Sequence, residues 1–110
     1  MPDEKSEAWH KVATTDEITE DSPKQVYVGD TAIGIFRVKE QIYAIDNICT
    51  HEYAPLTEGY VDGELVECPL HAAQFHIPTG DVLAPPATEK LRTYRVRVDG
   101  NDILVEVPRA

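Results

Sequence analysis

Two cysteines and two histidines stand at spacings that suit a metal site. Cys49-Thr-His51 is followed, after sixteen residues, by Cys68-Pro-Leu-His71, so each half supplies one thiol and one imidazole. A lone cysteine is most often a small buried apolar residue, and a lone histidine is most often a surface or hydrogen-bonded residue. Two Cys–His pairs at loop-type spacing, separated by an Asp62-Gly63 hairpin turn, instead predict ligation of iron or zinc.

The pattern of the two pairs bears on which metal they hold. A structural zinc site places four ligands on one tetrahedral ion, commonly through paired cysteines and paired histidines. Here each pair is mixed, and the first has only one intervening residue. A [2Fe–2S] cluster needs two ligands on each iron, and in one variety two thiolates hold one iron and two imidazoles the other. Two loops that each give one Cys and one His meet that need, and zinc remains the alternative.

The elements that must position these ligands are short strands joined by turns. No segment shows helical periodicity over three turns, although residues 16–21 are acidic and suit a turn or a brief helix. The sequence therefore predicts an all-β sandwich or barrel, with the Cys and His residues in loops beside hairpins. Residues 84–87 contain two prolines and indicate a stiff loop. The expected strands are 8–13, 25–28, 32–38, 41–45, 60–61, 64–67, 74–77, 91–98 and 102–107.

The length of 110 residues fits a single domain, 1–110, in which about 1–7 form a loose tail and about 47–86 hold the metal-binding loops. Two cysteines do not make a disulfide scaffold. No apolar run approaches the roughly 20 residues that cross a bilayer. The polar, acidic start lacks the pattern of a secretion signal. We therefore expect a cytoplasmic protein that does not enter a membrane.

The formal net charge is −10, which argues against nucleic acid as a partner because phosphate contacts require a basic face. No Lys or Arg occurs from Glu40 to Glu89. This stretch is either a solvated acidic surface or a field that steers a basic partner towards this half of the molecule. Its nine acids are Glu40, Asp46, Glu52, Glu58, Asp62, Glu64, Glu67, Asp81 and Glu89.

Over about residues 25–107 the chain resembles the Rieske family, and in particular the ferredoxins of bacterial three-component ring-hydroxylating dioxygenases. The resemblance implies a fold of small antiparallel sheets with two cluster-binding loops at one tip. It also implies one [2Fe–2S] cluster, with Cys49 and Cys68 on the inner iron and His51 and His71 on the outer iron. The matching segments are Cys49-Thr-His-Glu52, Glu58-Gly59, Asp62-Gly63, Glu67-Cys-Pro-Leu-His71 and Ala84-Pro-Pro86.

The resemblance further implies an electron carrier that is not itself an enzyme. Such a ferredoxin takes single electrons from a flavin-dependent ferredoxin reductase and gives them to a terminal Rieske oxygenase in aromatic compound degradation. We expect it to be a monomer. The alternatives are a small Rieske subunit of another redox enzyme, such as a nitrite reductase, and a structural zinc module.

The chain also departs from high-potential Rieske proteins. Ala54 and Leu70 stand where those relatives carry a further disulfide, and Ala73 and Phe75 stand where they carry a hydroxyl-bearing Ser and Tyr. Hydrogen bonds to cluster sulfurs raise the reduction potential. The sequence therefore predicts a potential of about −150 mV rather than about +300 mV. His76 is not expected to be a ligand, because four ligands are already present.

Overall fold

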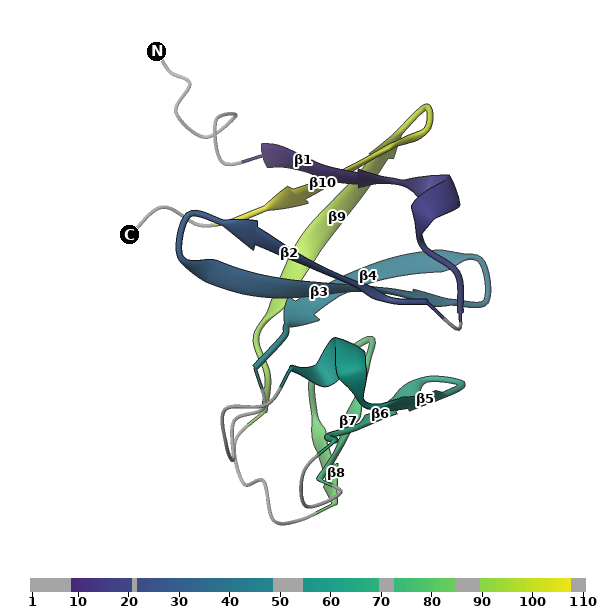
Figure 1. Cartoon of the computed structure of the whole chain (residues 1–110), viewed down its shortest axis with the longest axis vertical. Coiled ribbons are helices and arrows are strands. Elements are labelled where there is room, and N and C mark those ends of the chain that lie inside the picture. Colours follow the sequence, from purple (N-terminus) through teal and green to yellow (C-terminus); the bar gives the residue numbers. More distant parts are fainter. Residues whose placement is uncertain (1–8, 21, 49–54, 70–72, 85–89, 108–110) are drawn as a thin grey trace.

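The computed structural model describes residues 9–20, 22–48, 55–69, 73–84 and 90–107. These residues form ten strands and two short 3₁₀ helices (Figure 1). No helix within these ranges is long and apolar enough to cross a membrane. In chain order the elements are β1 (Trp9–Thr14), η2 (Thr15–Glu17), β2 (Lys24–Val28), β3 (Thr31–Val38), β4 (Gln41–Asp46), η3 (Leu56–Glu58), β5 (Tyr60–Asp62), β6 (Leu65–Glu67), β7 (Gln74–His76), β8 (Val82–Ala84), β9 (Thr93–Asp99) and β10 (Asp102–Glu106).

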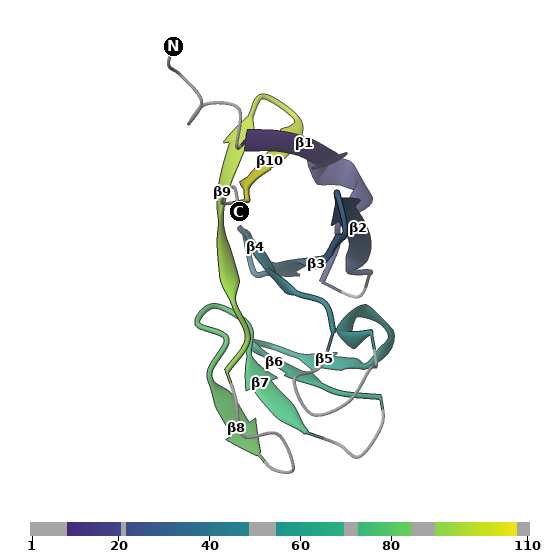
Figure 2. The same cartoon turned by 90° about the vertical axis from the view of Figure 1, so that its left-hand side faces the viewer.

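The larger sheet has six antiparallel strands in the order β1-β10-β9-β4-β3-β2. Figure 2 shows that this sheet curves round on itself, so that its two edge strands approach each other. The alternating apolar residues of β10, Ile103 and Val105, are fully buried and point into the curve. They belong to the barrel core, which also contains Ile33, Ile35, Ala44 and Tyr94.

The smaller sheet has four antiparallel strands in the order β5-β6-β7-β8. Val66 and Phe75 pair across β6 and β7 and are fully buried. They pack with Phe36 and Ile45 of the larger sheet in a second core, here called the inter-sheet core. One face of the smaller sheet is thereby buried, and its opposite face carries the exposed Tyr60.

Strand β3 separates the two cores. Ile33 and Ile35 face the barrel core, whereas Phe36 and Val38 face the inter-sheet core. Because side chains alternate along a strand, a strand buried on both faces reads as a nearly continuous apolar run. The apolar stretch of β3 has this cause, and it fixes the smaller sheet against the larger one.

The all-β prediction is confirmed, and every strand in the described residues had been expected except β8. Ala84, assigned to a stiff loop, ends β8 instead. The expected turn at Asp62-Gly63 lies one residue later, because Asp62 belongs to β5 and only Gly63 has a positive φ, of 62°. The range 47–86 given to the metal-binding loops contains η3 and the whole smaller sheet.

Candidate metal centre

Cys68 is the one predicted ligand that lies within the described residues. It follows the last residue of β6 and is only 2% exposed. It packs in the inter-sheet core beside Val66 and Phe75. A buried sulfur at a strand end, shielded from water on its apolar side, fits a thiolate that holds the less exposed iron of a cluster. Cys49, His51 and His71 lie outside the described residues.

The residues before and after the segment that carries His71 are hydrogen-bonded to each other. The backbone N–H of Cys68 donates to the carbonyl oxygen of Ala73 at 2.7 Å. One step further from the loop, Glu67 pairs with Gln74 in the β6–β7 ladder, and Gln74 Nε2 donates to Glu67 Oε1 at 3.1 Å. These contacts, here called the second neck, hold Cys68 and Ala73 next to each other at the base of the segment between them.

The segment that carries Cys49 and His51 is also closed at its base. Ile48 and Pro55 form an isolated antiparallel bridge, so the residues before and after 49–54 lie side by side. The carbonyl oxygen of Asn47 accepts the backbone N–H of Leu56 at 2.7 Å. These contacts, here called the first neck, join the end of β4 to the start of η3.

Both necks pack on the inter-sheet core, and β5 runs beside the strand that leads to the second neck. Gly59 follows η3, and a Cβ built on it would lie 2.0 Å from the carbonyl oxygen of Glu67 and 3.1 Å from Cδ of Pro69. Leu56 is fully buried in the same core as Cys68. A glycine is therefore required where the chain leaves η3 and enters β5, beside the strand that leads to Cys68. The bases of the two segments share one core, which contains Leu56, Cys68 and Ala73.

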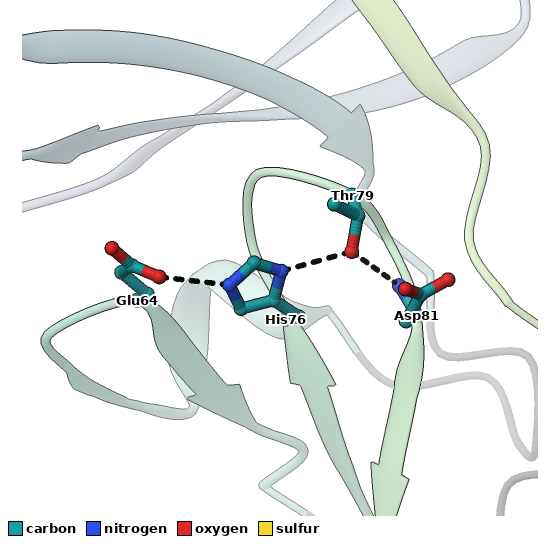
Figure 3. Close-up of polar contacts among 4 residues, drawn as sticks. All are labelled: Glu64, His76, Thr79 and Asp81. Carbon is teal, nitrogen blue, oxygen red and sulfur yellow. Dashed lines mark hydrogen bonds and ion pairs between the residues drawn. The ribbon is translucent and has the colours of Figure 1, made fainter.

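His76 is held by other side chains, as Figure 3 shows. Its Nε2 lies 2.8 Å from Oε1 of Glu64, and its Nδ1 lies 2.9 Å from Oγ1 of Thr79. Thr79 Oγ1 also accepts the backbone N–H of Asp81 at 3.2 Å. Both ring nitrogens have partners on the outer face of the smaller sheet, which agrees with the expectation that His76 is not a ligand.

Ala73 and Phe75 are both fully buried in the core that contains Cys68. Neither side chain has a hydroxyl group, so neither can donate a hydrogen bond to a sulfur. The absence of these donors was read from the sequence, and the structure adds that both positions flank the buried cysteine.

Charge on the described part of the smaller sheet is mostly negative. Asp62, Glu64 and Asp81 are exposed on the smaller sheet and its turns. The nearest bases come from the segment after residue 89, where Lys90 Nζ lies 3.6 Å from Oδ1 of Asp81. Such exposed pairs are weak. The smaller sheet therefore keeps an acidic surface.

Residues 8–95 match the Rieske [2Fe–2S] domain. The chain belongs to this family. The cofactor is therefore one Rieske-type [2Fe–2S] cluster. The two necks, one of them holding a buried cysteine, suit that group, because Leu56, Cys68 and Ala73 at their bases belong to one core.

Similar proteins show which group within the Rieske family the chain resembles. The chain is 38% identical, over 90% of its length and 92% of the relative, to the anthranilate 1,2-dioxygenase ferredoxin subunit of Burkholderia cepacia. It superposes with a TM-score of 0.84 on the ferredoxin of carbazole 1,9a-dioxygenase from Nocardioides aromaticivorans, at 36% identity, covering 89% of this chain and 96% of that one. A ferredoxin solved in complex with the oxygenase of carbazole 1,9a-dioxygenase gives a TM-score of 0.85 at 33% identity, with 90% and 93% covered. Like these relatives, the chain is an electron-transfer component and not a catalytic subunit.

The sequence did not reveal the roles that Asn47, Gly59 and Ala73 have beside the centre. Ala73 acts through its backbone carbonyl, and Asn47 acts through its backbone and its side-chain amide. Gly59 was named only as part of the family resemblance, whereas the structure shows its close approach to another strand.

Proposed function

We propose that this chain is a ferredoxin that carries single electrons from a flavin-dependent ferredoxin reductase to a terminal ring-hydroxylating oxygenase. The observation that carries the proposal is the buried Cys68 at the base of the second neck, in the same core as Leu56 of the first neck. When bound, a [2Fe–2S] cluster supplies a centre that accepts and releases one electron at a time. The relative solved with its oxygenase supports the choice of acceptor.

Four residues hold the cluster in this proposal. Cys49 and Cys68 ligate one iron, and His51 and His71 ligate the other. The burial of Cys68 supports the assignment of the cysteines to the inner iron. Because imidazole is neutral and thiolate is anionic, the added electron resides on the His-ligated iron. The chain works in the cytoplasm as a monomer in this proposal.

The chain's own residues guide the encounter with partners. The sequence from residue 40 to residue 89 carries nine acids and no Lys or Arg, and Asp62, Glu64 and Asp81 are exposed. A field of this sign speeds the approach of a basic surface and is screened by salt within about 10 Å at 0.1 M ionic strength. The docking face of the oxygenase is therefore basic, and its complex with the chain is transient.

The first experiment tests the centre itself. Electron paramagnetic resonance of the dithionite-reduced protein, with iron and sulfide analysis, should show two irons, two sulfides and the low average g value of mixed His/Cys ligation. A colourless protein that holds one zinc ion would refute the proposal.

The second experiment tests the partners. Oxygenase turnover should require the chain and a reductase together, and the rate should fall as salt is added. Asp62→Lys should slow electron transfer at low salt. Asp99→Lys makes the same charge change at the exposed end of β9 in the larger sheet and should slow it less. Equal rates for the two variants, or a rate that does not depend on salt, would refute charge steering by the smaller sheet.

A further inference from the structure

Asn47 is the only buried polar side chain within the described ranges, and it is fully buried. It follows the end of β4 and precedes Cys49 by two residues. A buried amide is retained only where its hydrogen bonds are made, so its partners show what it holds together.

The side chain of Asn47 joins two elements that are distant in sequence. Its Nδ2 donates to Oε1 of Gln25 on β2 at 2.5 Å and to Oγ1 of Thr57 on η3 at 3.2 Å. Its Oδ1 accepts the backbone N–H of Thr57 at 2.9 Å. Both donors and the acceptor of the amide are thereby used.

The backbone of Asn47 repeats this connection. Its N–H donates to the carbonyl oxygen of Ala32 on β3 at 3.0 Å, and its carbonyl oxygen accepts the N–H of Leu56 at 2.7 Å. Five hydrogen bonds from one residue thus tie the larger sheet to both sides of the first neck.

The larger sheet leaves room for this amide by means of Gly34. A Cβ at Gly34 would lie 2.8 Å from Oδ1 of Asn47 and 3.2 Å from Cγ2 of Thr57. At Gly34, strand β3 therefore presents its backbone to Asn47, where any larger side chain would displace the amide.

We propose that Asn47 is a positioning residue for the metal centre. It fixes the entry and exit of the segment that carries Cys49 and His51 against β2 and β3. Through that segment it sets the reduction potential of the cluster and the rate at which the cluster is lost, because both depend on ligand geometry and solvent access. The inference rests on the proposed function, since it requires those two residues to be ligands.

The test uses the purified, cluster-loaded full chain. Asn47→Ala should release iron to a chelator several-fold faster than the wild type, and should shift both the midpoint potential and the line shape of the reduced signal. Thr57→Val removes one of the bonds and should change the same quantities in the same direction by less, and Thr57→Ser should restore them.

The matched control is Asn101→Ala. Asn101 also bonds through its side chain to two residues, Thr15 and Asp16, but it lies in the turn between β9 and β10. Its removal should lower stability without moving the potential or the line shape. If Asn47→Ala and Thr57→Val match Asn101→Ala in all three readouts, the positioning role is wrong. A wild-type chain without a Rieske signal would instead refute the proposed function itself.

Discussion

His76 Nε2 lies 2.8 Å from Oε1 of Glu64. This pair links the end of β7 to the turn between β5 and β6 on the outer face of the smaller sheet, away from the loop necks. Since Thr79 occupies the other ring nitrogen, His76 has no free nitrogen for iron. We predict that His76→Ala keeps two irons and an unchanged reduced signal, and loses about 0.5–1 kcal/mol of stability. His71→Ala should lose the signal. Iron analysis and paramagnetic resonance check both variants, and loss of the cluster from His76→Ala would contradict the ligand assignment.

Gly59 leads to a second prediction, on stability. A methyl group there would meet the backbone oxygen of Glu67 at 2.0 Å, and backbone cannot rotate away. Gly59→Ala should therefore destabilise the protein by about 3 kcal/mol, at the upper end of overpacking effects, and should loosen the cluster. Gly100→Ala is the control, because its φ of 63° is strained for alanine but nothing lies within 4 Å, so about 1 kcal/mol is expected. Urea unfolding measures both, and equal losses would contradict the close approach.

The sequence predicted what depends on local pattern. Alternation at Ile103 and Val105 located β10. The spacing of Cys68 and His71 predicted a ligand pair, and this stays a prediction. Strand β8 was missed because three residues before a proline pair carry too short a pattern, and because its pairing with β7 shifts register between Gln74 and Phe75.

Residues that act across the fold could not be predicted. Asn47 meets Gln25 and Thr57, which are 22 and 10 residues away, so no window of sequence contains the arrangement. The close approach of Gly59 to Glu67 depends on the register of the β5–β6 hairpin, in which Tyr60 pairs with Glu67, and the turn expected at Asp62-Gly63 implied another register. The residue types and spacings of the predicted ligands could be recognised in the sequence, whereas the long-range contacts that position them could not.

Tyr94 leads to a prediction about alkaline pH. Burial, and then the hydrogen bond and charge of Asp46, raise the pKa of this phenol above its ordinary value of about 10. The unfolded chain therefore releases this proton at lower pH than the folded chain, so stability is full below about pH 10 and declines as pH rises further. Tyr94→Phe should cost about 1 kcal/mol at pH 8 and show a shallower decline above pH 10. Urea unfolding across that range measures both slopes, with Tyr60→Phe, at a 74% exposed site, as the control that should keep the wild-type slope.

Ala73 and Phe75 lead to a prediction about the reduction potential. Both are fully buried beside Cys68 and offer no hydroxyl, so the reduced cluster lacks two donors that would stabilise its added charge. We expect a midpoint near −150 mV, about the low end of the Rieske range. Ala73→Ser and Phe75→Tyr should each raise it, and the double variant should raise it most.

Phe36→Tyr separates this effect from a general change in polarity. Phe36 is also deeply buried and packs in the same core, but it comes from β3 and not from the β6–β7 pair that carries Cys68. Its added hydroxyl should destabilise the fold and leave the midpoint unchanged. Redox titration followed by circular dichroism measures all four variants. A wild-type midpoint well above zero would show that groups other than these two side chains set the potential. An equal shift in Phe36→Tyr would show that a hydroxyl anywhere in the inter-sheet core changes the midpoint potential of the cluster.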